Sequence, residues 1–366
     1  MKTFVSISIL AVSLTFGNVA VAQTTQKLSA TKANDYGLTY SLPKTVFDIT
    51  VEARHRVTQP GEFCNYAKRY LDVNDVITEP SHETTVESVT IVPRGVANPK
   101  DPWLVKFKSG SNVSMLLSDS NTPLGINVDE VEQAPKTVLP AAKAAAPTPL
   151  QTPEAKQAVT QEMSAASSMS KKAQLAAARI FELRETRNEL LSGSAENMPP
   201  DGKALELILN NLAAQEAALT AMFTGTVSEY TTVRTYSYEP LREKTETTVI
   251  ARLSPTDGLV EADNLSGDPI ELELTDIVTG KLPVNDKGET LPFPKGGVAY
   301  NIPGSATIVV SMNGRKLASL PVEIAQFGEV YGMNPSLFTD KKAPTFVEFS
   351  PLTGAIVRQG ELAPEK

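Results

Sequence analysis

The sequence predicts an α+β, β-rich fold in three parts: an N-terminal α+β domain, an antiparallel helical hairpin and a C-terminal β-sandwich-like domain. Three observations support this prediction. Apolar and polar residues alternate in both the first and the last third of the chain, which is typical of strands with one buried face. Two helical stripes of apolar residues lie between these regions. A stretch rich in Pro and Ala precedes the helices.

The first residues have the pattern of a secretory signal peptide. Lys2 precedes a short apolar run, and residues 20–22, Ala-Val-Ala, provide the small side chains that signal peptidase requires. We therefore expect a signal peptide over residues 1–22 and a mature chain that begins at Gln23. The apolar run is shorter than the roughly 20 residues that cross a bilayer. Residues 23–35 are small and polar, which predicts a flexible lead-in.

Residues 36–132 have the pattern of an α+β domain. Phe47, Ile49 and Val51 alternate with polar residues, so one face of this strand should be buried. Pro60 and the glycine after it should end the strand, and a short helix should follow. Further strands are expected where apolar runs lie between segments that contain Pro or Gly, namely over residues 87–92, 103–108 and 112–117.

Residues 133–156 have a different composition. Prolines alternate with Ala, Lys and Thr, and large apolar side chains are almost absent. Such a segment buries too little surface to offset the entropy lost on ordering. We expect an extended Pro/Ala-rich linker.

Residues 157–225 predict the helical hairpin. The first helix should end at Gly193, and Asp201 is a good N-cap for the second because its carboxylate can accept hydrogen bonds from free amides. Two short one-sided helices need a surface to pack on. The closest one along the chain is the C-terminal sheet, reached through Gly225, so we expect Leu212 to be buried there.

Residues 226–366 predict strands again. The strongest signal is Asn313-Gly314, because this dipeptide favours the type I′ turn that matches the twist of a β-hairpin. Alternating apolar residues flank the turn on both sides. Several strands separated by Gly and Pro are typical of a sandwich.

Composition excludes some classes of protein. The formal net charge is −8 and no basic patch is present, whereas binding to nucleic acid needs clustered Lys and Arg. Cys64 is the single cysteine of the 366 residues, so an internal disulfide is excluded and folding should rest on an ordinary core. We expect no cofactor.

Patterns for metal or nucleophilic chemistry are weak. His55 and His82 each lack a second His or Cys at ligand spacing. Ser-x-x-Lys sequences occur without their companion motifs, and no Gly-x-Ser-x-Gly is present. A pair of carboxylates for glycoside hydrolysis stays open. The acids of the helical hairpin lie among Arg184 and Arg187, which favours ion pairs over a dimetal site; these acids are Glu182, Glu185, Glu189, Glu206 and Glu216.

One strand offers a candidate binding surface. Its alternation places four side chains on one face: Tyr230, Arg234, Tyr236 and Tyr238. Exposed aromatic rings with Arg can stack on sugars or anchor a protein interface. The alternative is a half-buried face of a sheet.

Several segments along the chain form a recurring pattern. They are residues 40–45, 60–63, 66–71, 184–193, 200–202, 215–216, 223–225, 300–304, 325–328 and 350–355. Together these segments resemble a family of secreted proteins, domain of unknown function 4831. The resemblance covers nearly all of the chain after the predicted signal peptide, apart from the Pro/Ala-rich stretch. It implies an exported protein of Bacteroidota-type bacteria and brings no activity with it.

These observations predict a non-enzymatic exported protein of the cell envelope. It should act as a protein-binding scaffold or assembly component, in the periplasm, at the outer membrane or on the cell surface. Its partner should be another envelope protein, with no nucleic acid and no transmembrane segment in the mature chain. A glycan- or peptidoglycan-binding protein is the alternative, although a single tryptophan, Trp103, is few for a sugar binder. A hydrolase without a recognisable motif is the third hypothesis.

Overall fold

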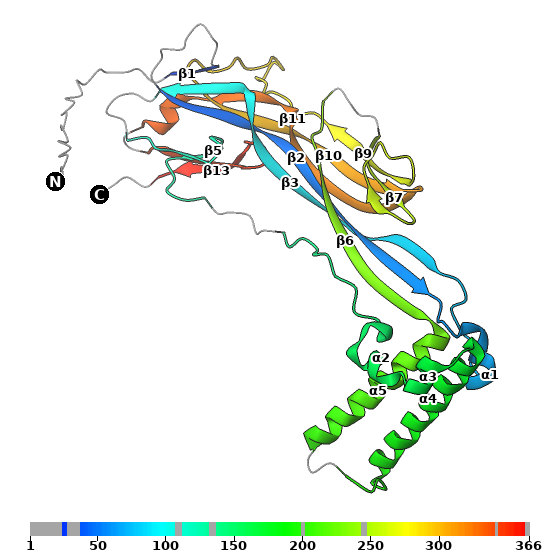
Figure 1. Cartoon of the computed structure of the whole chain (residues 1–366). Helices are drawn as coiled ribbons and strands as arrows, with labels where there is room; N and C mark the ends of the chain where they lie inside the picture. Colours follow the sequence, from blue (N-terminus) through cyan, green and yellow to red (C-terminus); the bar gives the residue numbers. More distant parts are fainter. Residues whose placement is uncertain are drawn as a thin grey trace, which may run out of the picture.

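The computed structural model describes residues 24–27, 37–106, 112–131, 137–198, 202–242, 247–340 and 343–362. The predicted signal peptide and the N-cap Asp201 lie outside these residues, as does most of the predicted lead-in. The chain is strand-rich, and its described strands form three antiparallel sheets. Two units are visible in Figure 1: a β body at one end and a group of helices at the other, joined by long strands.

The first sheet connects the two units. Its strand order is β1-β3-β2-β6, and all of its neighbours are antiparallel. β2 has 22 residues, which at about 3.4 Å per residue corresponds to roughly 70 Å of extended chain. We call this the long sheet; its strands are β1 (Thr24–Lys27), β2 (Leu38–Gln59), β3 (Ser81–Lys106) and β6 (Thr226–Tyr238).

β3 is longer than the sequence predicts. The sequence predicts separate strands over residues 87–92 and 103–108, because Pro93 and Pro99 lie between them. This break is wrong, because the strand runs through both prolines. β1 pairs with β3 only from Trp103 to Lys106, so on one side most of β3 is an edge of this sheet. A proline lacks the backbone N–H, and an edge strand can place that position away from the ladder.

The β body contains the other two sheets. One has the order β11-β10-β9-β7-β8 and the other β13-β12-β5-β4. The predicted turn at Asn313-Gly314 is confirmed: both residues have positive φ, 51° and 73°, and connect β10 to β11. The strands are β4 (Met115–Leu117), β5 (Pro123–Ile126), β7 (Thr248–Ser254), β8 (Gly258–Val260), β9 (Asp268–Val278), β10 (Val298–Met312), β11 (Arg315–Met333), β12 (Thr345–Phe349) and β13 (Ile356–Glu361); a turn of 3-10 helix, η4 (Pro335–Phe338), precedes β12.

Two cores hold the body together, and both combine early and late parts of the chain. In the first, Phe47 and Ile49 of β2 pack with apolar residues of β7, β9, β10 and β11. In the second, Tyr40 and Trp103 pack with residues of β5, β10 and β12. The Tyr40 hydroxyl donates to the Ala299 carbonyl at 3.1 Å and accepts from the Ala299 amide at 2.9 Å. Burial raises the pKa of Tyr40 far above its ordinary value.

The predicted division into a domain over 36–132 and another over 226–366 therefore needs correction. β6 pairs along its whole length with β2, and β5 pairs with β12. Each region has strands with a buried face, as the alternation predicts. The alternation does not say which strand lies beside which, and here the partners come from the other region.

The helices form a separate unit at the far end of the long sheet, which we call the helical head (Figure 1). Its core contains Phe63, Ile180, Leu183, Leu219 and Phe223, all nearly or fully buried. The first long helix ends at Gly193, as predicted, with φ of 73°. The elements are η2 (Cys64–Tyr66), α1 (Ala67–Leu71), η3 (Pro149–Gln151), α2 (Pro153–Ala158), α3 (Gln161–Ala165), α4 (Met169–Ser192) and α5 (Gly202–Thr224).

The expected packing of these helices on the C-terminal sheet is wrong. The connection between β2 and β3, which contains η2 and α1, and the short helices α2 and α3 contribute side chains to their core. Leu212 is only partly buried at its margin, whereas Leu183 and Leu219 are in its centre. No described helix is long and apolar enough to cross a membrane.

The predicted linker over 133–156 is only partly an extended connection. Residues 137–148 form no helix or strand, and most of them are exposed. The segment nevertheless docks on the edge of β6, where Lys143 and Thr231 exchange two hydrogen bonds at 3.0 Å. From Pro149 the predicted linker belongs to η3 and α2 of the head, and Ala155 of α2 is buried.

Candidate functional site

The four residues of the predicted binding surface lie on one face of β6, but they have different surroundings. Tyr236 and Tyr238 pair with Ile49 and Phe47 of β2 and pack on the margin of the first core. Burial raises the pKa of both tyrosines. Arg234 forms an ion pair with Glu261 at 3.3 Å. Half of the row is thus a half-buried sheet face, the alternative that the sequence left open.

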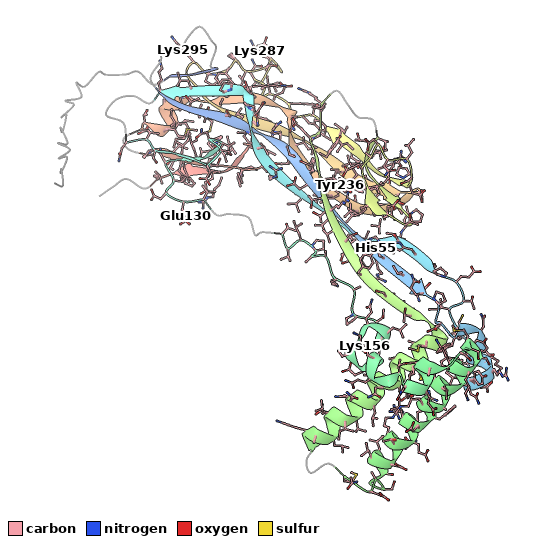
Figure 2. All side chains as sticks on the ribbon, viewed as in Figure 1. His55, Glu130, Lys156, Tyr236, Lys287 and Lys295 are labelled. Carbon is pink, nitrogen blue, oxygen red and sulfur yellow. The ribbon has the colours of Figure 1, made fainter. Side chains whose placement is uncertain are left out.

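Tyr230, the remaining member, belongs to a histidine cluster. Its ring stacks on His55 at a centroid distance of 4.4 Å. His55 Nδ1 lies 3.1 Å from His82 Nε2, and His55 Nε2 lies 2.9 Å from Thr232 Oγ1. Figure 2 shows His55 on the long sheet, closer to the helical head than Tyr236. Burial and the neighbouring His82 lower the pKa of His55.

No pattern in the sequence indicates this pairing. The two histidines are far apart along the chain, and only the register of β2 against β3 brings them together. Gly258 leaves space for the His55 ring: a Cβ atom there would lie 2.5 Å from His55 Cε1. No cluster of three or more His, Cys, Asp or Glu suited to a metal ion occurs among the described residues.

We predict that acid weakens the fold through this cluster. Because the pKa of His55 is lower in the folded chain than its ordinary value of about 6.5, the unfolded chain binds more protons as pH falls below that value. The free energy of unfolding should therefore decrease as pH falls from about 7 through 6. Thermal unfolding at several pH values measures this. His55→Gln should flatten the dependence in this range; an unchanged slope would contradict the prediction.

The long sheet also carries a small charged pocket of about 320 Å³, whose lining includes Tyr230 and Thr231 of β6. Arg54 pairs with Glu87, and Ser88 donates to Glu52 at 2.9 Å. Lys143 of the docked segment also lines it. Its acids, Glu52, Glu87 and Glu229, exceed its bases by one, but each acid already has a side-chain partner, Ser88, Arg54 and Arg56 respectively. We therefore assign no ligand to this pocket.

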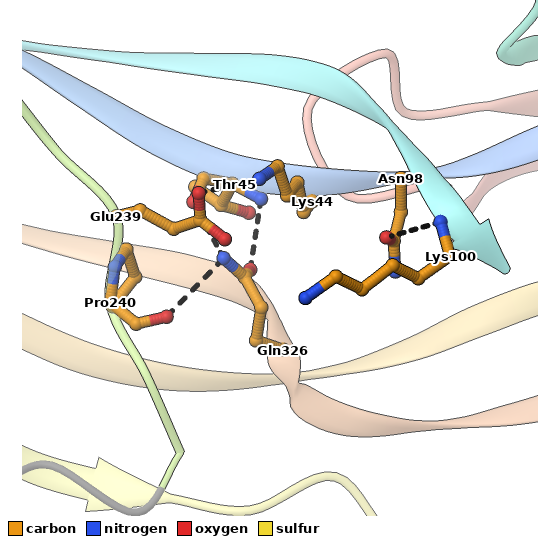
Figure 3. A network of polar contacts seen from close by, with 7 residues as sticks. All are labelled: Lys44, Thr45, Asn98, Lys100, Glu239, Pro240 and Gln326. Carbon is orange, nitrogen blue, oxygen red and sulfur yellow. Dashed lines mark hydrogen bonds and ion pairs between the residues drawn. The ribbon is translucent and has the colours of Figure 1, made fainter.

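A third polar cluster joins the long sheet to the β body (Figure 3). The side-chain amide of Gln326 accepts from the Thr45 amide at 2.9 Å and donates to the Thr45 carbonyl at 2.8 Å. The Thr45 hydroxyl also accepts from the Ala325 amide at 3.0 Å. Lys44 beside it pairs with Glu239. Thr45 pairs with β3 on one side, whereas the pairing of β2 with β6 on the other side ends at Phe47. Gln326 thereby provides hydrogen bonds to the Thr45 backbone that β6 does not provide.

Gln326→Leu should therefore destabilise the body by about 1–3 kcal/mol, the effect of leaving a buried donor unsatisfied. Thr45 is fully buried, so water cannot easily replace the lost partner. Chemical denaturation measures the change. Gln359→Leu, at an exposed position of β13, is the control and should have little effect. Equal stability of the two variants would show that the hydrogen bonds between Gln326 and Thr45 contribute nothing to the free energy of unfolding.

Another pocket, with a volume of about 450 Å³, lies on the helical head. Glu216 of α5 accepts from Arg184 Nε at 2.6 Å and from Arg187 Nη1 at 2.7 Å, both from α4. The lining of the pocket also includes Pro149 and the small residues Ala213, Ala217, Thr220, Ala221 and Thr224. The predicted ion pairing of the helical acids is confirmed for Glu216, and for Glu182, which pairs with Arg179 at 2.8 Å.

Taken together, these features define a strand-rich protein in which a long antiparallel sheet separates a β body from a helical head. The chain belongs to the family described as Domain of unknown function (DUF4831), which matches residues 36–357. The match spans β2, β3 and β6 of the long sheet, the head and most of the body, and β1 lies outside it. No curated protein and no solved structure matched the chain.

Proposed function

We propose that this protein is a non-enzymatic, exported component of the cell envelope that acts as a protein-binding scaffold or assembly component. The observation that carries the proposal is the long sheet, which holds two separately packed units apart. Because each unit has its own core, each presents a surface that can bind a partner protein independently of the other.

The proposal assigns the two units different roles. We interpret α4 and α5 as an antiparallel helical hairpin and the body as sandwich-like, so that the hairpin is the projecting arm and the body the platform. Two exposed apolar side chains on the arm, Leu191 at 64% and Leu207 at 72%, provide positions at which contact with a partner can be tested. The Lys2-led apolar run and residues 20–22 support export, to the periplasm, the outer membrane or the cell surface.

Cross-linking in intact cells tests the scaffold role. A photoreactive amino acid at Leu207 should capture a defined envelope protein, since this exposed side chain lies on the arm. The same probe at Val357, exposed on β13 of the body, shows whether the body has a partner of its own. Absence of any cross-linked protein from both positions, with the chain in the envelope fraction, would contradict the proposal.

One observation favours glycan binding as a second function. Phe293 is 39% exposed and stacks on Trp103, with centroids 5.7 Å apart and an angle of 13° between the rings. A partly exposed aromatic ring held flat can stack on the apolar face of a sugar. Sedimentation with purified peptidoglycan tests this function; Phe293→Ala should reduce sedimentation if the ring is the contact, and equal sedimentation would exclude that site.

A further inference from the structure

The pocket of the helical head has an unbalanced charge. Three charged residues line it, Arg184, Arg187 and Glu216. The Glu216 side chain is only 14% exposed, whereas those of Arg184 and Arg187 are 40% and 35% exposed. Glu216 is therefore the most buried of the three side chains, and both arginine side chains are partly exposed. The local balance is one positive charge in excess.

The geometry also leaves hydrogen-bonding capacity. A guanidinium has five N–H donors in a fixed fork, and a carboxylate has two oxygens. Glu216 receives one bond from each arginine through different oxygens. One carboxylate cannot satisfy two such forks, but it does hold both of them in place. A second carboxylate that approaches from solvent would find donors already oriented.

The rest of the pocket suits a polypeptide. Ala213, Ala217 and Ala221 follow at intervals of four on α5, so they lie on one side of this helix, and all three line the pocket. Small side chains of this kind let a backbone approach closely. Thr220 and Thr224 add hydroxyl groups to the lining. Small side chains beside two arginines suit an acidic side chain on an extended segment.

We propose that this pocket binds an acidic peptide segment of a protein partner, with a Glu or Asp carboxylate placed between Arg184 and Arg187. The inference rests on the proposed scaffold function and identifies the site at which the protein would contact its partner. Glu216 has the role of a positioning residue: it orients the two guanidinium groups and competes with the incoming carboxylate for them.

Fluorescence anisotropy with a labelled peptide tests the site directly. The probe is Ala-Ala-Glu-Ala-Ala with blocked ends, so that it carries one carboxylate; the matched probe has Gln in place of Glu. The full chain should bind the Glu peptide more tightly than the Gln peptide. Arg187→Gln should weaken binding of the Glu peptide by about tenfold or more, the effect of losing a charge-assisted hydrogen bond.

The variant Glu216→Gln separates a binding site from a structural ion pair. If the arginines bind ligand, removal of the competing charge should tighten binding of the Glu peptide. If the cluster only braces the helices, this variant should lower stability without a gain in affinity. Lys171→Gln removes a positive charge from an exposed position of α4 outside the pocket, and should leave binding unchanged. Arg187→Lys keeps the charge and provides a second test should Arg187→Gln fold poorly.

Three results of the peptide assay would overturn the inference: no binding of the Glu peptide, equal binding of the Glu and Gln peptides, or tighter binding of inorganic phosphate than of the Glu peptide. The cross-linking experiment tests the scaffold role separately. Capture of the same partner by Arg187→Gln would show that the pocket is not the contact with this partner, and the scaffold role would stand. Peptide binding without any cross-linked partner would contradict the scaffold role, and the pocket would stand as a binding site.

Discussion

Replacing Phe223 with alanine should destabilise the helical head by about 3–5 kcal/mol, the usual effect of truncating a buried phenylalanine. Phe223 is fully buried near the end of α5, and its ring packs on that of Phe63 at a centroid distance of 5.3 Å. Phe63 lies in the connection between β2 and β3, so this contact joins α5 to the end of the long sheet. Loss of the ring leaves a cavity at that junction.

Circular dichroism at the helical minimum, followed in denaturant, measures this effect. Phe181→Ala is the matched control, because Phe181 is on α4 of the same head and is 52% exposed. Its substitution should change stability by at most about 0.5 kcal/mol. Similar midpoints for the two variants would show that the head is not packed around Phe223.

Phe47→Ala should have an effect of the same size on the β body, about 3–5 kcal/mol. Phe47 is a fully buried residue of β2, and the core around it includes β7, β9, β10 and β11. The substitution thus acts on strands more than 200 residues away in the sequence. Were the two predicted β domains independent, damage at Phe47 would leave the late strands protected.

Hydrogen exchange resolved by segment distinguishes these outcomes. In Phe47→Ala, protection of the amides of β9 and β10 should decrease together with that of β2, because one core unfolds as a unit. Leu265→Ala provides the control, since this side chain is 79% exposed in the connection between β8 and β9. Loss of protection confined to β2 would show that the body is divided as the sequence predicted.

Local structure was largely predictable. The alternation over Phe47, Ile49 and Val51 marks a buried face that the structure confirms, and Asn313-Gly314 marks a turn that it also confirms. Gly193 ends a helix because a residue without Cβ adopts left-handed φ at little cost. Each of these features depends on a few neighbouring residues, so their pattern in the sequence is sufficient.

The candidate sites were less predictable. Tyr230, Arg234, Tyr236 and Tyr238 do lie on one face of a strand, but the period of two does not reveal what covers that face. The charges of the two helices alone predicted that Glu216 pairs with arginines. The pocket around Glu216 could not be predicted, because Pro149 in its lining comes from the Pro/Ala-rich stretch, for which an extended linker was expected.

The amino-acid pattern was enough to locate strands, turns and long helices, because backbone preference and the burial of one face act within a few residues. Which strands become neighbours depends on complementary edges and shared cores, and these are properties of the assembled chain. Tertiary structure therefore decided that β6 lies beside β2, that His55 meets His82, and that Gln326 binds the backbone of Thr45. It also placed the helices at the far end of the long sheet, since the turn at Phe63 covers their apolar faces in place of the C-terminal sheet.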